Sequence, residues 1–457
     1  MSLPSIKTLL AVWLGKGIAC VNRTLGRGGT SLPGMAALKV DPALIKKLVS
    51  QHRQVIVVTG TNGKTTTNNI LAGILIRAGY RVAWNRAGAN MKSGIATALI
   101  ENTSLLGKAR TSTALLEVDE ATVPLVLADL QPAIMVVTNF FRDQLDRYGE
   151  LDKTVALIAE GAKKIPGLKL ILNADDPLVA SLAQRTGRDS YFYGVAASRW
   201  VSRVPEQVRE GCHCPFCSHC LEYAYYHFSQ LGNYRCPQCG FSRPPVHWEA
   251  VDPDMAPGIT FYLQEKEERW RLSLPLEGYY NLYNVLAAAA AARFMGIDQK
   301  IVAEAVRTYT PQTGRMEEFN IGGKRVLLVL VKNPAGFNQV LRSLLLKEGP
   351  LNMVIAINDL DADGKDVSWL WDVNFEMLAK APVGKIICTG LRGADMAVRL
   401  KYAGIPEEKL RIIDDREEAV EEGLNLIGPG ETLYVLPTYT NLFPMSKILS
   451  SRQGKRK

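Results

Sequence analysis

The loop Gly60-Thr-Asn-Gly-Lys-Thr65 follows a short β-branched run and precedes a stretch, Thr65 to Ala78, that is compatible with a helix. A loop at a strand-to-helix junction offers backbone N–H groups and the positive end of the helix dipole to a polyphosphate. Lys64 would reach the β- and γ-phosphates, and the Thr65 hydroxyl would ligate magnesium. The loop departs from the general G-x-x-x-x-G-K-[ST] pattern because residue 58 is valine.

A second set of residues suited to chemistry is Cys214-Pro-Phe-Cys217 and, eighteen residues later, Cys236-Pro-Gln-Cys239. This spacing is typical of a zinc ribbon, in which two knuckles close a tetrahedral thiolate site. Four thiolates fill the coordination shell of zinc, so we expect a structural site. Cys212 and Cys220 are interpreted as bystanders, although Cys212 could compete for the first knuckle.

Residues 59–66, TGTNGKTT, resemble the nucleotide loop of the Mur ligase superfamily, which includes the folylpolyglutamate synthetases. These enzymes make an acyl phosphate from a carboxylate and ATP, and an amine then attacks it. Four further segments match in the order of the family: Glu117-Val-Asp-Glu120, Asn173-Ala-Asp-Asp-Pro177, Gly278-Tyr-Tyr-Asn-Leu-Tyr-Asn284 and Gly314-Arg-Met-Glu317.

The resemblance implies a site for ATP and magnesium. Its catalytic residues in this chain would include Lys64 and Glu117, and a carboxylate such as Glu117 suits magnesium, which prefers oxygen ligands. Thr65 would be the other magnesium ligand. The nucleotide would be bound by Gly60, Thr61, Asn62, Gly63, Lys64, Thr65, Thr66, Asn281, Asn284 and Arg315.

The combination of a Mur-type loop and an inserted four-cysteine ribbon resembles the MurT family, the synthetase-like subunits of lipid II isoglutaminyl synthases. The resemblance covers nearly the whole chain, including residues 24–34 and 138–150. In the second segment other Mur ligases place a metal-binding histidine, whereas this chain has Gln144. An amide is a weaker ligand than imidazole, which argues against a second magnesium site. No lysine is assigned to the position that many of those ligases carbamylate.

In the C-terminal part, residues 332–337 occupy the place of a superfamily loop that faces the acyl phosphate, and residues 361–372 look like the signature of the MurT C-terminal domain. Local propensities alone predict a turn and then a helix capped by Asp366 or Ser368, with two core tryptophans. The resemblance implies a GatD-type glutaminase as partner, to whose catalytic histidine this chain lends an aspartate. We choose Asp366 for this role over Asp361, Asp363 and Asp372, because it lies just past the Asp-Gly turn.

The five histidines are all outside the C-terminal part, so Cys388 has no histidine beside it to form a glutaminase pair. Ammonia for an amidation would therefore come from a partner or from solution.

Two stretches of the sequence, in each of which strands alternate with helices, are expected to position these residues. Strands are expected at Gln54–Thr59, 114–118, 133–138 and Lys169–Asn173, and then at 325–331, 353–358, 385–390, 410–414 and Thr432–Pro437. The predicted fold is α/β: a Mur-ligase-type P-loop domain with a parallel sheet at 51–312, carrying the ribbon at about 205–250, and a Rossmann-like domain at 313–457. Residues 1–50 would be a basic segment packed on the central domain.

Length and composition agree with this division. The 457 residues suggest about three domains, and the longest apolar run, 285–292, is too short to cross a membrane. No secretion signal is recognised, so a cytoplasmic protein is expected. Residues 1–50 contain seven basic side chains and one acidic one, within a net charge of +9. This excess is either a solvated face or a site for polyanions or an anionic membrane surface.

The resulting prediction is ATP-dependent amidation of the D-glutamate α-carboxylate of lipid II to D-isoglutamine, at the inner face of the membrane. One alternative is a Mur- or folylpolyglutamate-type ligase that adds an amino acid. Another is a zinc-ribbon nucleic-acid binder. Residues 212–243 contain only Arg235 and Arg243 against Glu222, so no nucleic-acid partner is expected.

Overall fold

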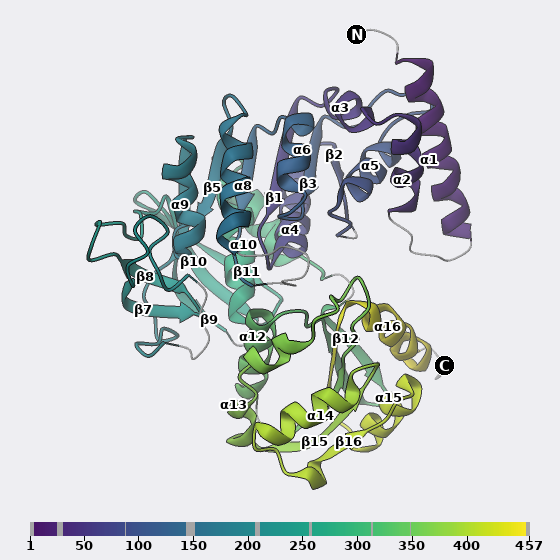
Figure 1. Ribbon diagram of the computed structural model, residues 1–457, viewed down its shortest axis with the longest axis vertical. Coiled ribbons are helices and arrows are strands. Elements are labelled where there is room, and N and C mark those ends of the chain that lie inside the picture. Colours follow the sequence, from purple (N-terminus) through teal and green to yellow (C-terminus); the bar gives the residue numbers. More distant parts are fainter. Residues whose placement is uncertain are drawn as a thin grey trace.

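The computed structural model describes residues 4–24, 31–86, 88–142, 151–205, 211–255, 258–311, 314–347 and 349–453. These residues form two large sheets with helices on both faces, and a small hairpin at the edge of the larger sheet (Figure 1). The expected Gln144 and the expected boundary at 312/313 lie outside the described residues, so both stay predictions. Among the described helices, none combines the length and apolar character needed to cross a bilayer.

The larger sheet has the strand order β11-β10-β9-β6-β5-β4-β1-β3-β2. In this order, each neighbouring pair from β9 through β6, β5, β4, β1 and β3 to β2 is parallel. The pairs β9–β10 and β10–β11 are antiparallel. This antiparallel extension was not expected from the sequence. Its strands alternate buried and exposed side chains, as in a sheet with one solvated face. The bounds are β1 Gln54–Thr59, β2 Val82–Trp84, β3 Thr113–Glu117, β4 Ile134–Val137, β5 Lys169–Asn173, β6 Ser190–Val195, β9 Trp248–Asp254, β10 Ile259–Glu265 and β11 Glu268–Leu274.

Helices cover both faces of this sheet and enclose two hydrophobic cores. One face carries α4 (Lys64–Arg77), α10 (Tyr279–Phe294) and α11 (Gln299–Arg307). The alanine run of α10 is completely buried, because its small side chains let α10 approach both α4 and the sheet. The other face carries α5 (Lys92–Glu101), α6 (Val123–Leu130), α8 (Leu151–Lys163) and α9 (Pro177–Thr186).

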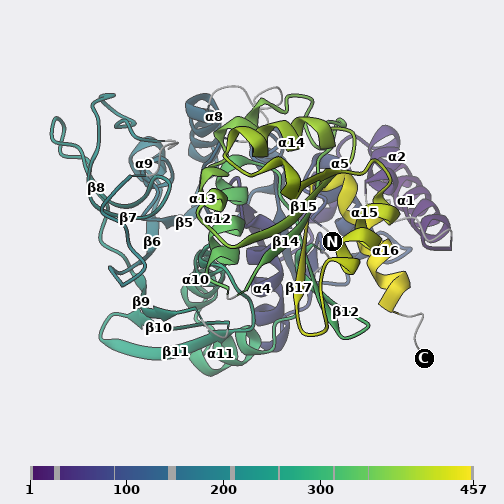
Figure 2. The same ribbon diagram turned by 90° about the horizontal axis from the view of Figure 1, so that it is seen from below.

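Three N-terminal helices extend the second face: α1 (Ile6–Thr24), α2 (Leu32–Val40) and α3 (Leu44–Val49). Helix α1 packs on α2 and α5, and α3 packs on α5 and α6. Figure 1 shows α1 at one end of the molecule, and Figure 2 shows the ribbon hairpin at the opposite end.

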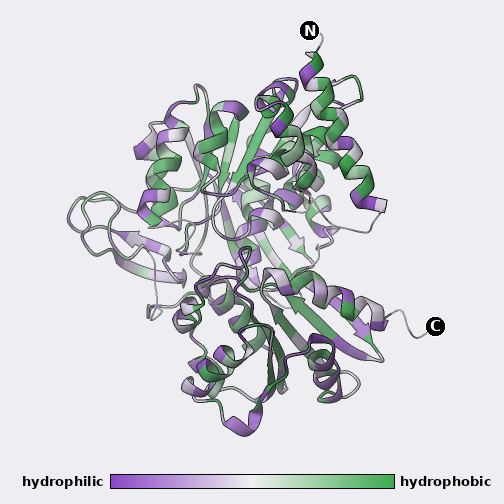
Figure 3. Ribbon diagram, turned by 45° about the vertical axis from the view of Figure 1, so that its right-hand side comes forward, coloured by the Kyte–Doolittle hydropathy of each residue, from purple (hydrophilic) through white to green (hydrophobic). Residues whose placement is uncertain are grey.

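The second sheet has the order β12-β13-β17-β14-β15-β16, in which only the pair β12–β13 is antiparallel. Its cores lie on both faces, and hydrophobic colour is concentrated in the strands (Figure 3). The strands are β12 Arg315–Ile321, β13 Lys324–Val329, β14 Leu351–Ala356, β15 Val383–Thr389, β16 Leu410–Ile412 and β17 Thr432–Pro437. The helices are α12 Pro334–Leu345, α13 Glu376–Ala379, α14 Gly393–Tyr402, α15 Arg416–Asn425 and α16 Tyr439–Gln453, with short 3₁₀ helices at Ser368–Asp372 and Glu407–Lys409.

The inserted ribbon consists of β7 (Glu222–Phe228) and β8 (Leu231–Arg235) with a cysteine knuckle before and after them. The four sulfur atoms of Cys214, Cys217, Cys236 and Cys239 lie within 4.8 Å of one another, an arrangement that could hold a metal ion. The predicted bystanders, Cys212 and Cys220, are not part of this group among the described residues. Tyr234 packs with the buried cysteines, as expected of an aromatic residue in the ribbon core.

Buried polar contacts at the end of β5 attach the ribbon to the larger sheet. Asp175, which is fully buried, accepts hydrogen bonds from Arg243 Nε at 2.5 Å and from Tyr283 Oη at 2.8 Å. Its backbone carbonyl accepts from the Gly232 N–H at 2.9 Å. The carboxylates beside Arg243 hold the pKa of its guanidinium above the usual value, in spite of its burial. One side chain therefore joins β5, α10 and the ribbon.

We expect one metal ion per chain, bound by these four cysteines. Cys236→Ser should abolish metal binding and lower the melting temperature, because the ligands must come together for so small an insert to fold. Metal analysis by mass spectrometry and thermal unfolding measure the two effects. Cys212→Ser and Cys220→Ser are the matched controls and should leave both unchanged. Full metal content in Cys236→Ser would contradict the assignment.

Candidate functional site

The loop between β1 and α4 has a backbone that only glycine adopts without strain at two positions. Gly60 has φ +119° and Gly63 has φ +85°. A Cβ atom at residue 63 would lie 1.9 Å from Asn284 Oδ1 on α10. The absence of a side chain therefore lets α10 approach the loop.

Two asparagines from distant segments, Asn139 and Asn333, bind Asn62 at the tip of this loop. The Asn62 N–H donates to Asn139 Oδ1 at 2.8 Å, and Asn62 Oδ1 accepts from Asn333 Nδ2 at 2.9 Å. Asn333 precedes α12, where its own Oδ1 caps the helix by accepting from the Gly336 N–H at 2.8 Å. The loop thus contacts the second sheet's domain directly through Asn333.

Lys64 is buried at the first position of α4. Its Nζ forms an ion pair with Glu120 Oε2 at 2.7 Å and donates to the carbonyls of Gly60 and Thr61. Burial acts to lower the pKa of Lys64, but the carboxylates of Glu120, Asp119 and Glu117 raise it above its usual value. The side chain is therefore a buried ammonium group, paired with a carboxylate at the base of the loop.

Thr65 and Glu117, the two predicted magnesium ligands, both lie beside Gly88. Glu117 Oε1 accepts from Asn90 Nδ2 at 2.9 Å, whereas its buried Oε2 has no hydrogen-bond partner among the described residues. Residue 88 is a glycine, and a Cβ at that position would lie 3.1 Å from Thr65 Oγ1 and 3.6 Å from Glu117 Oε2. Because glycine has no Cβ, this position beside the two oxygen atoms is left open. A hydroxyl and an unsatisfied carboxylate oxygen around such a space fit a hard divalent cation.

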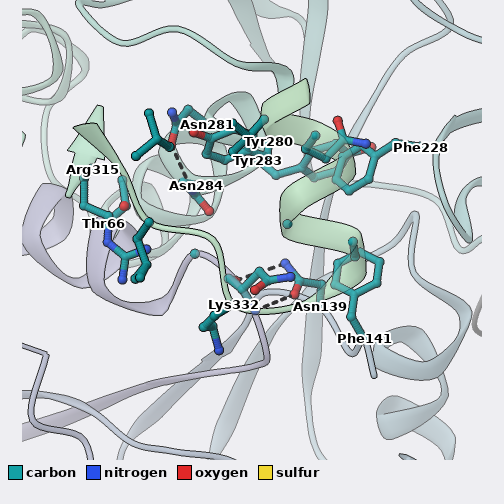
Figure 4. Close-up of a pocket in the computed structure, with 18 of the residues that line it drawn as sticks. Thr66, Asn139, Phe141, Phe228, Tyr280, Asn281, Tyr283, Asn284, Arg315 and Lys332 are labelled. Atoms are coloured by element: carbon teal, nitrogen blue, oxygen red, sulfur yellow. Dashed lines mark hydrogen bonds between the residues drawn. The ribbon is translucent and has the colours of Figure 1, made fainter. Parts of the chain in front are cut away.

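A pocket opens between the loop, α10 and the second domain (Figure 4). Six of the predicted nucleotide-binding residues line it: Asn62, Gly63, Thr66, Asn281, Asn284 and Arg315. The other four, Gly60, Thr61, Lys64 and Thr65, belong to the loop but do not line the pocket. Of these, Thr61 bonds to the backbone of Phe141, and Thr65 accepts a long hydrogen bond of 3.4 Å from Arg315 Nη2.

Two walls of the pocket face each other. Figure 4 shows Arg315 and Thr66 on one side and Phe228 and Phe141 on the other. Asn284 Nδ2 donates to Asn281 Oδ1 at 2.9 Å, so the two asparagines of α10 fix each other's orientation.

Sequence reasoning missed several of the lining residues. Tyr280, Asn139 and Lys332 lie within segments that the sequence singled out, although their own roles were not recognised. Phe228 had no such signal, because it belongs to the ribbon insert. It reaches the pocket by packing against Tyr283 of α10, at a ring-centroid distance of 5.7 Å.

The aspartates of residues 361–372 are distinguished by their contacts. Asp363 is buried and accepts from the Thr440 N–H at 2.8 Å, and Asp372 pairs with Arg142 at 3.4 Å. Asp361 pairs with Lys365 at 3.4 Å. Asp366 is exposed, and its Oδ1 accepts from the Ser368 N–H at 2.8 Å at the start of the 3₁₀ helix. Hydrogen bonds from Ser368 lower the pKa of Asp366.

The expectation of two core tryptophans was wrong for Trp371. Trp369 is partly buried against the core, but Trp371 is 54% exposed. The segment is a 3₁₀ helix, and residues two apart in such a turn point to different sides, so only one ring can face the core. Trp371 instead lies over the buried Arg399, whose guanidinium carbon is 5.3 Å from the ring centroid, and beside Tyr402.

Cys388 lies inside β15 and is fully buried. Burial raises the pKa of its thiol to about 12. A thiol so protonated and inaccessible is unsuited to nucleophilic attack on glutamine.

Comparison with known proteins agrees with this architecture. Residues 58–235 match the Mur ligase middle domain, and residues 330–442 match the MurT ligase C-terminal domain. Among solved structures, the chain is similar in fold to a pseudomurein peptide ligase type C from Methanothermus fervidus (TM-score 0.65, 23% identity, 87% of this chain and 78% of that one). It is also similar to a MurF ligase from Thermotoga maritima in complex with ADP (TM-score 0.64, 14% identity, 92% and 85%).

Two relatives are similar along almost their whole length. The MurT subunit of the glutamine-hydrolysing lipid II isoglutaminyl synthase of Staphylococcus aureus (strain COL) is 38% identical over 96% of this chain and 97% of its own. The corresponding subunit of Streptococcus pneumoniae (strain ATCC BAA-255 / R6) is 34% identical over 99% of both chains. With its Mur ligase fold, its four-cysteine ribbon and this similarity, the chain belongs to the MurT family of lipid II isoglutaminyl synthase subunits.

Proposed function

We propose that this chain is the synthetase subunit of a lipid II isoglutaminyl synthase. The α-carboxylate of D-glutamate in the stem peptide attacks the γ-phosphorus of ATP, and ADP leaves. Ammonia then attacks the acyl phosphate, inorganic phosphate leaves, and the product is D-isoglutamine. The observation that carries the proposal is the pocket where the glycine loop, α10 and Arg315 meet, in a chain so similar to MurT subunits.

ATP would lie in this pocket with its phosphates on the loop of residues 60–66. The N–H groups at the start of α4 and the charge of Lys64 would face the β- and γ-phosphates. The tyrosines and asparagines of α10 would line the adenine side, and Arg315 would reach the phosphates from the second domain. These contacts act by charge and position, as is usual for phosphoryl transfer.

Magnesium would be held by Thr65 and Glu117 and would neutralise charge on the phosphates. Glu117 Oε2, which has no hydrogen-bond partner in the part of the chain that the structure describes, and the space left by Gly88 support this assignment over Asp119. Glu120 is committed to Lys64.

Zinc is the proposed ion of the ribbon, because four cysteine thiolates in two knuckles suit its tetrahedral geometry. With all four positions filled by protein, the ion has a structural role and takes no part in the reaction.

A GatD-type glutaminase would supply the ammonia, because Cys388 is buried and the chain has no histidine in its C-terminal part. Asp366 is the aspartate offered to that partner, since the other three are buried or paired with a cation. The reaction would take place at the cytoplasmic face of the membrane, where the lipid-linked substrate is presented.

The experiment that tests the function combines both chains with lipid II, ATP and glutamine, and follows the stem peptide by mass spectrometry. An amide on D-glutamate that depends on both chains supports the proposal. Addition of a whole amino acid would instead identify an amino-acid-adding Mur-type ligase.

Lys64→Ala should lower the rate of amidation by about 10²–10³-fold, because charge facing the transferred phosphoryl group is lost. Initial rates of amidation measure the effect, and Lys300→Ala, at an exposed lysine in the first turn of α11, is the control. Glu120 loses its partner in this variant, so Lys64→Ala/Glu120→Gln checks folding. The double variant should regain thermal stability without regaining activity. A rate near that of the wild type in Lys64→Ala would exclude the assigned role.

Glu117→Ala should cause a large loss of activity that excess magnesium partly restores, because one of two protein ligands is missing. The magnesium dependence of the amidation rate is the measurement. Glu160→Ala, at an exposed carboxylate of α8, should keep the wild-type dependence. If magnesium dependence is unchanged in Glu117→Ala, the ligand is another residue, and Asp119 would be tested next.

Asp366→Asn should reduce glutamine-dependent amidation by about 10²–10⁴-fold, because an orienting carboxylate fixes the histidine tautomer and stabilises the imidazolium. Complex formation and ATP binding should persist, and ammonium chloride should rescue amidation if the synthetase site accepts free ammonia. Asp361→Asn, at an exposed aspartate five residues away, is the matched control. Full glutaminase activity of Asp366→Asn in the complex would refute the choice of residue.

A further inference from the structure

Helix α1 has apolar residues on two opposite faces. Its buried face packs against α2 and α5 and includes Ala11, Val12 and Ala19. On the opposite face lie Ile6, Leu10, Trp13, Leu14 and Val21, all exposed. Their spacing of three, four and seven residues places them in one stripe. The stripe is not needed for the packing of α1, because the buried face already makes those contacts.

An adjacent loop extends the stripe. Trp13 Nε1 donates a hydrogen bond to the backbone carbonyl of Leu105 at 2.8 Å, so this loop lies beside the middle of α1. The side chains of Leu105 and Leu106 are 60% and 69% exposed. We call the seven residues Ile6, Leu10, Trp13, Leu14, Val21, Leu105 and Leu106 the α1 patch. Contiguous exposed apolar side chains of this size are typical of an interaction surface.

Most of the charged side chains around the α1 patch are positive. Residues 4–24 and 102–112 contain five cations and no carboxylate: Lys7, Lys16, Arg23, Lys108 and Arg110. Burial, followed by the nearby charge of Arg110, lowers the pKa of Lys16, against the opposing effect of Glu101. Glu101 at the rim is paired with Arg23 at 2.7 Å.

The geometry points to an anionic bilayer surface as the occupant of the α1 patch. An amphipathic helix that carries leucine, isoleucine and tryptophan and is bordered by lysine and arginine suits the interface of a bilayer, where apolar side chains insert and cations contact phosphate headgroups. The inference rests on the proposed function only in one respect, namely that a lipid-linked substrate would be presented at such a surface. Its test does not require activity.

The α1 patch also lies far from the ribbon hairpin, at the other end of the molecule (Figures 1 and 2). Docking through α1 therefore leaves the ribbon away from the membrane. Membrane attachment and the ribbon would be separate features of the chain.

The first test is flotation of the full-length chain with vesicles of phosphatidylcholine, with and without phosphatidylglycerol. Ile6→Ser/Leu10→Ser/Leu14→Ser should lower partitioning into the anionic vesicles about tenfold or more, since the inserted apolar area is lost. The matched control is Ile76→Ser/Leu125→Ser/Leu157→Ser, which changes one exposed isoleucine and two exposed leucines on other helices. Equal partitioning of the two triple variants would overturn the inference.

The second test identifies the residue that enters the bilayer. Lipids brominated on their acyl chains should quench part of the tryptophan fluorescence of the wild type, and Trp13→Phe should remove this quenching. Trp371→Phe, at another half-exposed tryptophan, should retain it. Quenching that survives in Trp13→Phe and disappears in Trp371→Phe would place the membrane contact on the second domain and overturn the inference.

The third test concerns charge. Lys7→Gln/Lys108→Gln should weaken binding to the anionic vesicles about fivefold for each charge removed and leave binding to neutral vesicles unchanged. Raising the salt concentration should reduce the difference. An identical loss on neutral vesicles would show that charge is not recognised and would contradict an anionic surface.

A second copy of the chain is the competing occupant. Analytical ultracentrifugation that shows a wild-type dimer, and a monomer for the Ile6/Leu10/Leu14 variant, would overturn the membrane assignment.

Amidation of a soluble, lipid-free stem-peptide substrate separates the two proposals. If the chain amidates the soluble substrate but its vesicle binding does not depend on the α1 patch, only the inference is refuted. If vesicle binding depends on the α1 patch but no amidation occurs, only the proposed function is refuted.

Discussion

The close approach of α10 to the glycine loop is the constraint on which the site depends. Any side chain at residue 63 would collide with Asn284, so the loop and α10 can meet only at a glycine. The approach also requires the alanine-rich interior of α10, which packs on α4 and on the sheet. Through the same helix, Tyr283 reaches Asp175 and thereby the ribbon. The wall of the pocket at the loop and α10 therefore depends on the glycine backbone of residue 63. The wall at Phe228 depends on the ribbon insert.

Two kinds of interaction hold the loop, and they differ in strength. The ion pair of Lys64 with Glu120 is buried, so removal of either partner would leave an uncompensated charge at a cost of about 3–5 kcal/mol. The contacts between Asn62 and Asn333 are neutral hydrogen bonds, each contributing about 1 kcal/mol. The first stabilises the loop within its own domain. The second links the loop to the C-terminal domain by two neutral hydrogen bonds.

The functional surfaces are distributed over separate parts of the chain. The pocket proposed for the nucleotide lies between the domains, and the second domain carries Asp366 and an exposed aromatic pair, Trp371 and Tyr402. The α1 patch lies at the far end of the first domain. Such separation would allow the chain to contact a nucleotide, a glutaminase and a bilayer at the same time.

The sequence by itself determined the features that depend on local spacing. The strand, loop and helix at residues 54–77 and the two cysteine knuckles could be predicted, because neighbouring residues supply the backbone geometry and the ligands. Four of the nine strands of the larger sheet and five of the six strands of the second sheet were also predicted, since buried parallel strands are continuous apolar runs. The antiparallel strands β9 to β11 were missed, because their alternation with exposed polar residues hides them among loops.

Tertiary structure decided everything that depends on contacts between distant segments. Only the fold shows that Phe228 of the ribbon reaches the pocket and that Glu120 pairs with Lys64. It also shows that one oxygen of Glu117 has no hydrogen-bond partner among the described residues. The exposure of Trp371 and of the α1 stripe was equally hidden, because an apolar residue has the same sequence signature in a core and on a docking surface. Burial is set by what packs against a side chain, and that depends on residues far away along the chain.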